Sequence, residues 1–169
     1  MITLYVDDAL VIGRHEEDCT SLVDKIADRF AIKRLSGQIF IGIEISKQAG
    51  EISLSQRRYI RDVLARFNMT DAKGVSCPIA DAKHLVEWQN SKPATEHYRE
   101  MIGCLMYLAN TTRPDILFAV NLLARHNNDP RDCHWKAGKH VLRYLKQTED
   151  YQIVYRSDQK CMLAYSDSD

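Results

Sequence analysis

Short apolar runs separated by polar residues dominate the first third of the chain. Residues 2–6 and 9–12 are two such runs, and only Asp7 and Asp8 stand between them. This spacing is typical of a two-residue β-hairpin. Over residues 19–30 the apolar residues then recur three and four positions apart, a period that predicts an amphipathic helix after the hairpin.

The next apolar segments predict a second pair of strands and the start of a helical region. Residues 39–45 are apolar and β-branched, and residues 52–54 can pair with them across a polar loop that contains Gly50. Over residues 59–67 the apolar positions take helical spacing, and Ser55 is placed where it could cap this helix.

Most of the remaining chain has a helical pattern. A less regular connection over residues 70–93 comes first. Three apolar stripes with helical spacing follow, over residues 98–109, 116–124 and 135–145. Pro114 stands where a first-turn proline belongs. Short β-rich runs return at residues 152–155 and 162–165 and predict two further strands.

The composition is that of a soluble globular protein. Lys plus Arg and Asp plus Glu both total 23, so the net charge is zero, and any nucleic-acid site must come from local clusters. No apolar run has the length of a signal-peptide core or a membrane span. The 5 cysteines are spread out and include no C-x-x-C pair, which favours free intracellular thiols over a disulfide framework or a zinc site.

The acidic pair Asp7-Asp8 has two interpretations. Aspartate is common in tight turns because its side chain bonds the nearby backbone, so the pair can be turn chemistry alone. The other interpretation is a metal site, because carboxylate oxygens are the ligands that Mg²⁺ and Mn²⁺ prefer. A pair of such metals can activate a primer hydroxyl and stabilise the leaving pyrophosphate. The motif Y-V-D-D is too short to decide between these interpretations.

Longer motifs along the chain carry a family resemblance. Residues 5–13 read Y-V-D-D-A-L-V-I-G, and residues 40–46 read F-I-G-I-E-I-S. Residues 98–125 begin Y-R-E-M-I-G-C-L-M-Y-L-A-N, and residues 134–148 read H-W-K-A-G-K-H-V-L-R-Y-L-K-Q-T. In this order the segments resemble the reverse transcriptase of copia-type LTR retrotransposon Pol polyproteins. The final A-Y-S-D-S-D, residues 164–169, resembles the first strand of the RNase H domain that follows in that family.

The resemblance implies an RNA-directed DNA polymerase that uses two divalent metal ions, Mg²⁺ or Mn²⁺. In this family the Y-V-D-D hairpin binds the metals, so Asp7 and Asp8 are expected to be metal ligands and catalytic residues. The later F-I-G segment grips the primer strand, which makes Phe40, Ile41 and Gly42 candidate primer contacts. The implied partners are an RNA template paired with a DNA primer, together with deoxynucleoside triphosphates, and no membrane.

The resemblance also implies limits on what this chain does alone. Reverse transcriptases need a third aspartate from an earlier palm strand, and fingers that hold the nucleotide, but only six residues precede Asp7. Asp167 resembles the first catalytic RNase H carboxylate, in a site that needs further carboxylates. We therefore expect two incomplete sites and little or no activity from this chain alone. The remaining polymerase segments, or a second copy, are the expected partners.

Basic residues gather on two of the predicted helices. One helix carries Arg57, Arg58, Arg61 and Arg66. On the last helix the basic residues recur at i, i+3, i+7 and i+10, as Lys136, Lys139, Arg143 and Lys146. A solvated polar face explains such stripes without any function. The alternative is a nucleic-acid contact surface that follows the phosphates of a template–primer duplex, with salt-dependent and sequence-independent binding.

The sequence thus predicts an α+β fold in three parts. Residues 1–55 are expected to be the C-terminal part of a reverse-transcriptase palm, with the metal-binding hairpin and a primer-grip-like hairpin. Residues 56–150 are expected to form an all-helical thumb and connection block, and residues 151–169 the first strands of an incomplete RNase H-like domain. Strands that lack their palm neighbours should show unpaired edges and exposed apolar faces.

A second hypothesis treats the chain as a non-catalytic remnant of a transposable element that binds nucleic acid or a protein partner. The two hypotheses differ in whether the function requires the acidic hairpin. The resemblance implies a cytoplasmic location, inside a virus-like particle for the parent element, with the nucleus as the alternative.

Overall fold

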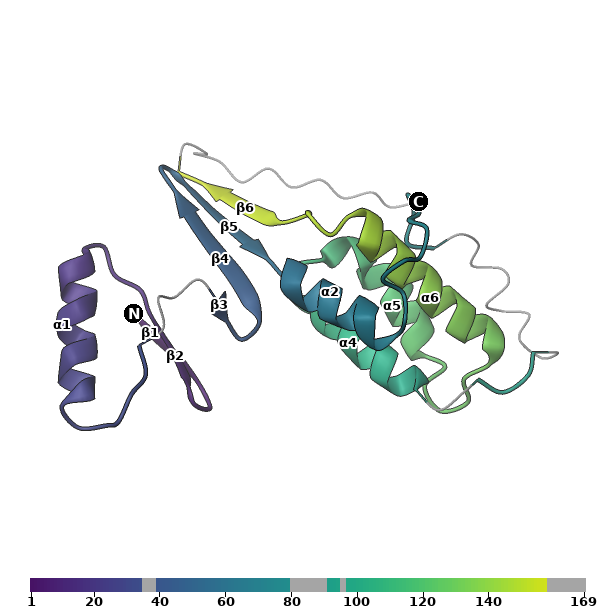
Figure 1. Ribbon diagram of the computed structural model, residues 1–169, viewed down its shortest axis with the longest axis horizontal. Helices are drawn as coiled ribbons and strands as arrows, with labels where there is room; N and C mark the ends of the chain where they lie inside the picture. The colour runs from purple at the N-terminus through teal and green to yellow at the C-terminus, as the bar shows by residue number, and fades with distance from the viewer. Residues whose placement is uncertain (35–38, 80–90, 95–96, 158–169) are drawn as a thin grey trace, which may run out of the picture.

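The computed structural model describes residues 1–34, 39–79, 91–94 and 97–157. The predicted strand over residues 162–165 and the candidate Asp167 lie outside the described residues. Within the described residues the chain is α+β, as expected. Figure 1 shows antiparallel hairpins and α1 before a group of packed helices, with a last strand after it.

The elements follow the predicted order. The strands are β1 (Ile2–Tyr5), β2 (Asp8–Val11), β3 (Ile39–Phe40), β4 (Ile43–Gln48), β5 (Glu51–Ser55) and β6 (Ile153–Arg156). The helices are α1 (Glu16–Ala27), α2 (Arg57–Arg66), α4 (Tyr98–Thr111), the 3₁₀ helix η2 (Pro114–Ile116), α5 (Leu117–Ala124) and α6 (Asp132–Gln147). The helices α2, α4, α5 and α6 together are called the helical block below.

β1 and β2 form the predicted antiparallel hairpin, but its turn lies one residue earlier than expected. Tyr5 pairs with Asp8, so the turn residues are Val6 and Asp7 rather than the two aspartates. Val6 has a φ of 51°, in the left-handed region. A positive φ at the first turn position suits the twist of a two-residue hairpin, although it strains a β-branched residue. The two aspartates were expected in the turn because aspartate prefers turns and valine prefers strands. The pairing of Tyr5 with Asp8 overrides these preferences.

The segment around Gly42, predicted as one strand, is instead a second tight hairpin. β3 turns back at Ile41 and Gly42 and pairs with β4, with Phe40 opposite Ile43. Ile41 and Gly42 have φ values of 51° and 72°. Positive φ at both positions is the feature of a type I′ turn, which glycine adopts without a steric cost. The prediction was wrong because the apolar, β-branched composition hid a turn that only Gly42 signals.

The strands β3, β4, β5 and β6 form one antiparallel sheet in that order. The strand predicted over residues 152–155 is present as β6, and it pairs with β5, with Leu54 opposite Ile153. Strands on either side of the helical block in the sequence therefore lie side by side (Figure 1). The division of the chain into palm, thumb and RNase H-like parts stays a prediction.

The buried core belongs to the helical block. The apolar stripes predicted for its helices face inward, and the most buried members include Ile60, Met101, Leu105, Leu108, Val120, Leu123, Leu142 and Leu145. Trp135 of α6 packs edge-on against Phe67, which follows α2, with ring centroids 6.2 Å apart. Each fully buried aliphatic side chain contributes roughly 1.5–3 kcal/mol, so this cluster is the main source of stability.

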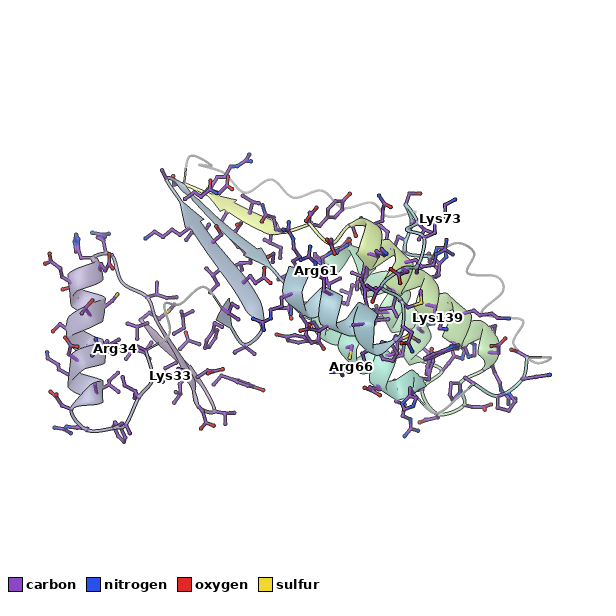
Figure 2. All side chains as sticks on the ribbon, in the orientation of Figure 1. Lys33, Arg34, Arg61, Arg66, Lys73 and Lys139 are labelled. Carbon is purple, nitrogen blue, oxygen red and sulfur yellow. The ribbon has the colours of Figure 1, made fainter. Side chains whose placement is uncertain are left out.

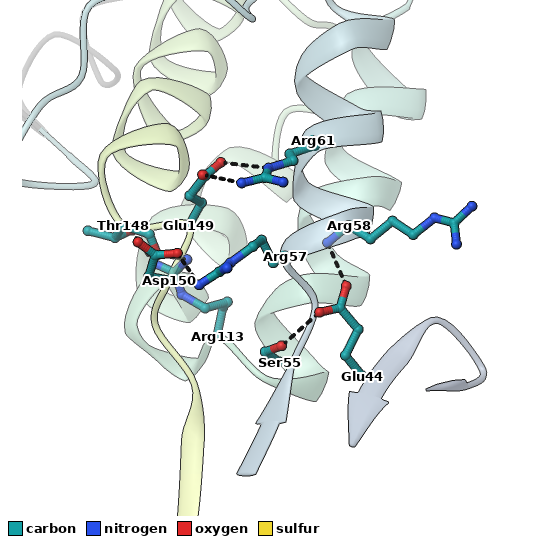
Figure 3. A network of polar contacts seen from close by, with 9 residues as sticks. All are labelled: Glu44, Ser55, Arg57, Arg58, Arg61, Arg113, Thr148, Glu149 and Asp150. Atoms are coloured by element: carbon teal, nitrogen blue, oxygen red, sulfur yellow. Dashed lines mark hydrogen bonds and ion pairs between the residues drawn. The ribbon is translucent and has the colours of Figure 1, made fainter. Parts of the chain in front are cut away.

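A carboxylate from the sheet, and not Ser55, satisfies the start of α2. Ser55 ends β5, and its hydroxyl donates to Glu44 Oε2 at 3.2 Å. Glu44 Oε1 accepts the backbone N–H of Arg58, in the first turn of α2, at 2.8 Å (Figure 3). The prediction of a Ser55 cap was wrong because Glu44 lies at the helix N-terminus, where the helix dipole favours a negative charge.

Residues 1–34 contribute nothing to the buried core. None of them is buried. Leu4 and Val6, for example, are 72% and 79% exposed. The exposed apolar surface expected for the first hairpin is therefore confirmed, on a sheet that has two strands among the described residues. In the part of the chain that the structure describes, no helix combines the length and apolar character needed to cross a membrane.

Candidate metal-binding hairpin and nucleic-acid interface

The tip of the first hairpin carries both predicted metal ligands. Asp7 lies in the turn, and Asp8 opens β2 opposite Tyr5. Both aspartates are exposed. At the other end of the hairpin, the N–H of Ile12 donates to the carbonyl oxygen of Met1 at 2.9 Å. The paired strands therefore hold two adjacent carboxylates that face solvent.

The donor chemistry of this hairpin fits a hard divalent cation. Carboxylate oxygens are the preferred ligands of Mg²⁺ and Mn²⁺, and Asp7 and Asp8 supply them from neighbouring positions. Among the described residues, no third His, Cys, Asp or Glu joins them to form a metal-binding group. The hairpin thus accounts for two ligands, and a two-metal site requires others from elsewhere.

The three candidate primer contacts lie together at the second hairpin. Phe40 ends β3, and Ile41 and Gly42 form the turn that follows. The Tyr107 hydroxyl of α4 donates to the carbonyl oxygen of Ile41, which bonds this turn to the helical block. β2 and β3 also contact each other, so the two hairpins are neighbours. The role of the three residues as primer contacts stays a prediction.

Two of the four basic candidates on α6 bind the chain itself. Arg143 Nε donates to the carbonyl oxygen of Lys73 at 2.6 Å, and Lys146 Nζ donates to that of Thr70. These bonds attach the segment that follows α2 to α6. Arg143 and Lys146 therefore have a structural role that their spacing did not reveal, and contact with nucleic acid stays a prediction for both.

The other two basic candidates interact with side chains of α6 itself. Lys136 Nζ is 2.8 Å from Asp132 Oδ2, one turn earlier on α6, and the lysine side chain is 74% exposed. Lys139 Nζ is 5.4 Å from the ring centroid of Trp135, a cation–π contact. Lys136 is exposed and Lys139 is half-buried, and both remain candidates for phosphate contacts.

Three of the four arginines of α2 form ion pairs with acidic residues of other helices and loops. Arg61 binds Glu149 through two nitrogen atoms, with Nη2 2.8 Å from Oε1 (Figure 3). Further pairs join Arg57 to Asp150 and Arg66 to Glu100. Figure 2 shows Arg61, Arg66 and Lys139 on the helical block. Exposed ion pairs of this kind contribute little to stability, so a phosphate can compete for the arginines.

The sequence is similar to known reverse transcriptases and to Pol polyproteins. A family profile described as reverse transcriptase (RNA-dependent DNA polymerase) matches residues 1–81. The retrovirus-related Pol polyprotein from transposon RE2 of Arabidopsis thaliana is 41% identical over 98% of this chain. The one from transposon TNT 1-94 of Nicotiana tabacum is 34% identical over 100% of it. The chain belongs to the copia-type reverse transcriptase family.

This reverse transcriptase segment is a small part of those polyproteins. It spans 12% of the RE2 polyprotein and 14% of the TNT 1-94 polyprotein. An uncharacterized mitochondrial protein of Arabidopsis thaliana is 30% identical over 99% of the chain, which covers 70% of that protein. No solved structure matches the segment significantly.

One charged residue inside the reverse transcriptase segment was missed by sequence reasoning. Arg113 is 1% exposed and lies between α4 and η2. It binds Asp115 through two hydrogen bonds, Nε to Oδ1 at 3.0 Å and Nη2 to Oδ2 at 2.7 Å. An arginine between two apolar stripes is the signal that could have identified it, because a buried charge requires a partner.

The carboxyl of Asp115 is held in its ionised form. Burial alone raises its pKa, but the hydrogen bonds and the charge of Arg113 lower it by more. The Tyr144 hydroxyl also donates to Asp115 Oδ2, at 2.9 Å, and lowers the pKa further. The net result is a pKa below the ordinary value for aspartate, so this ion pair is charged at neutral pH.

Proposed function

We propose that this chain forms the part of a copia-type reverse transcriptase that presents two carboxylates to the catalytic metal ions and supports the template–primer duplex. The proposed reaction is RNA-directed DNA synthesis. The observation that carries the proposal is the pair of adjacent, exposed aspartates on a tight hairpin, inside the segment that matches the family. Because the chain spans 12% of the RE2 polyprotein, other segments or a second copy would supply the remaining groups.

Asp7 and Asp8 would hold Mg²⁺ or Mn²⁺ in this proposal. When bound, such ions activate the primer hydroxyl and stabilise the charge that develops during in-line transfer from a deoxynucleoside triphosphate. The ladder between β1 and β2 fixes the backbone of both aspartates before any metal arrives. Little conformational freedom is therefore lost when the carboxylates bind the ions.

The RNA–DNA duplex would contact the second hairpin and α6. Phe40, Ile41 and Gly42 would touch the primer strand. Lys136 and Lys139 are the candidates on α6 whose ammonium groups are not bonded to a backbone carbonyl. Phosphate contacts from such lysines supply affinity without sequence preference.

We expect the chain to bind an RNA–DNA duplex with an affinity that falls as the salt concentration rises. The double variant Lys136→Gln/Lys139→Gln should bind more weakly, because it loses two positive charges from α6. The slope of log affinity against log salt should decrease by about 1 for each phosphate contact that is lost. Fluorescence anisotropy with a labelled hybrid, between about 50 and 200 mM salt, measures both the affinity and the slope.

The matched control is Lys25→Gln/Lys47→Gln, which removes two exposed lysines from α1 and β4. If the α6 variant and this control bind alike, the proposed contact between α6 and the duplex is contradicted. An affinity that does not depend on salt would contradict phosphate contacts anywhere on the chain.

A non-catalytic binding module is the second candidate. Its support is that the buried apolar residues lie between Ile60 and Leu145, whereas residues 1–34 bury none, so the helical block does not need the acidic hairpin for its core. Duplex binding that survives in Asp7→Asn/Asp8→Asn, together with DNA synthesis that ignores these aspartates, would favour this candidate.

A further inference from the structure

The turn of the second hairpin is bonded to the helical block by a tyrosine. The Tyr107 hydroxyl, from α4, donates to the carbonyl oxygen of Ile41. A Cβ atom at Gly42 would lie 3.4 Å from that hydroxyl oxygen. We propose that Tyr107 is a positioning residue that holds the Ile41–Gly42 turn in the conformation that contacts the primer. This role rests on the proposed function, in which the turn touches the primer strand.

Ile41 needs support because its backbone conformation is unfavourable. Its φ of 51° lies in the left-handed region, where a β-branched side chain crowds its own backbone. Such a conformation persists only where the surrounding structure holds it. Within the described residues β3 contributes Ile39 and Phe40 to the ladder, so the described pairing gives the turn little support on that side. The bond from Tyr107 selects the conformation in which the Ile41 carbonyl points to α4.

The Tyr107 side chain is itself held in place. Its ring meets the ring of Tyr59, from α2, edge-on, with centroids 5.1 Å apart. Burial raises the pKa of the Tyr107 hydroxyl, and the neighbouring Gln56 opposes this rise without cancelling it. The hydroxyl is therefore protonated at neutral pH and can donate to the Ile41 carbonyl throughout the physiological range.

Tyr107 also lies near the first hairpin. Besides burial, which is the larger cause, Tyr5 at the end of β1 contributes to the raised pKa of Tyr107. β2 and β3 also contact each other. The Tyr107 hydroxyl thus binds the turn of the second hairpin and lies within electrostatic range of the first. Loosening the turn would move the primer contact relative to Asp7 and Asp8, so we expect an effect on duplex binding rather than on folding.

Tyr107→Phe tests this role, because it removes the hydroxyl and keeps the ring against Tyr59. We expect the amide hydrogen of Ile43, which pairs with Phe40 across the turn, to exchange about tenfold faster, since the bond that holds the turn against α4 is lost. Duplex affinity should fall by a similar factor. Amide exchange is measured by NMR on the free chain and affinity by anisotropy, and the urea midpoint of the helical block should hardly change. Tyr155→Phe, which removes an exposed hydroxyl from β6, is the matched control.

Ile41→Asn supplies a rescue that a purely structural role would not give. Asn-Gly is a preferred pair for a type I′ turn, so the turn would form without help from Tyr107. We expect the double variant Ile41→Asn/Tyr107→Phe to recover slow exchange at Ile43, which pairs with Phe40 across the turn. If Tyr107 acted only through the packing of α4, the double variant would remain as defective as Tyr107→Phe.

Other outcomes overturn particular parts of the proposal. Unchanged exchange at Ile43 in Tyr107→Phe would overturn the positioning role. Faster exchange with unchanged affinity would overturn the link between the turn and the primer. A wild-type chain that binds no duplex would overturn the proposed function, while the exchange rates would still show whether Tyr107 fixes the turn.

Discussion

Replacing Arg113 with methionine is expected to lower the free energy of unfolding by about 3 kcal/mol. Methionine fills much of the space but leaves Asp115 without its cation. Breaking a buried ion pair by removing one partner costs about 3–5 kcal/mol. We expect the lower end of this range because the Arg113 side chain is 1% exposed but that of Asp115 is 31% exposed, so water can compensate in part.

The effect is large because Arg113 connects three segments. Besides Asp115, it bonds the end of α6, where Nη1 donates to the carbonyl oxygen of Thr148 at 2.9 Å (Figure 3). Its guanidinium carbon is 5.6 Å from the ring centroid of Tyr144 and 5.3 Å from that of Tyr151. The two cation–π contacts are lost with the charge. Because Tyr151 leads into β6, the last strand would lose part of its attachment to the helical block.

Urea unfolding followed by far-UV circular dichroism measures this effect. Arg61→Met is the matched control, because it removes an arginine from an exposed pair with Glu149, and we expect it to unfold close to wild type. The double variant Arg113→Met/Asp115→Leu should recover part of the loss, since no carboxylate is then left without a cation. If Arg113→Met unfolded at the midpoint of the Arg61→Met control, the buried ion pair would have no stabilising role.

The same pair should make stability depend on pH in the acid range. Burial raises the pKa of Asp115, but Arg113 and Tyr144 lower it by more, so the folded pKa is below the unfolded one. A carboxyl of this kind adds stability above its unfolded pKa, about 3.9, and the contribution disappears as the pH falls through the folded pKa.

The stability difference between wild type and Asp115→Asn should therefore be constant near neutral pH and shrink in acid. Urea unfolding of both proteins from about pH 6 to pH 2 measures this difference. Asp62→Asn, on the exposed side of α2, is the control whose difference from wild type should vary less. A difference for Asp115→Asn that stays the same down to the lowest pH would contradict the lowered pKa.

The helical block could be predicted from the sequence because its signal is long and repetitive. Positions such as Leu105 on α4 and Leu142 on α6 recur every three or four residues, and both are fully buried. Burial of such stripes supplies most of the folding energy, so local pattern and final structure agree. At the two hairpin turns, the local sequence pattern and the final structure disagree. Val6 and Ile41 prefer strands, yet both lie in turns with positive φ, because the register of the closing pair decides and no local preference specifies it.

Charged residues set a second limit on prediction. Spacing places Arg143 on a basic stripe of α6, but its partner is the carbonyl oxygen of Lys73, 70 residues earlier. Arg61 pairs with Glu149, 88 residues later. Periodicity identifies the face of a helix that a basic residue occupies, and it says nothing about which group of another segment will meet it. The interpretation as a duplex contact is therefore stronger for Lys136, whose side chain remains in solvent.

The largest functional effect is expected at Asp7. We expect the 169 residues alone to extend no primer with Mg²⁺ or Mn²⁺, since the described residues offer the two aspartates no third ligand. Within a primer-extending copia-type polyprotein that carries these residues as its matching segment, Asp7→Asn should slow extension by about 10³-fold or more. The amide keeps the size of the side chain but removes a charge and a metal ligand. Removing one residue of a cooperating catalytic group costs nearly the whole rate enhancement that the group supplies.

Asp28→Asn provides the control, because Asp28 is an exposed carboxylate in the same N-terminal part, at the end of α1. Wild-type extension in this control, beside the loss in Asp7→Asn, would assign the metals to the hairpin. If the isolated chain extended a primer and Asp7→Asn abolished it, a second copy or residues outside the described ones would complete the site, and the expected inactivity would be wrong. If both variants extended equally, the metal role would fail. Duplex binding would then be the remaining function, since the helical block keeps its core without the hairpin.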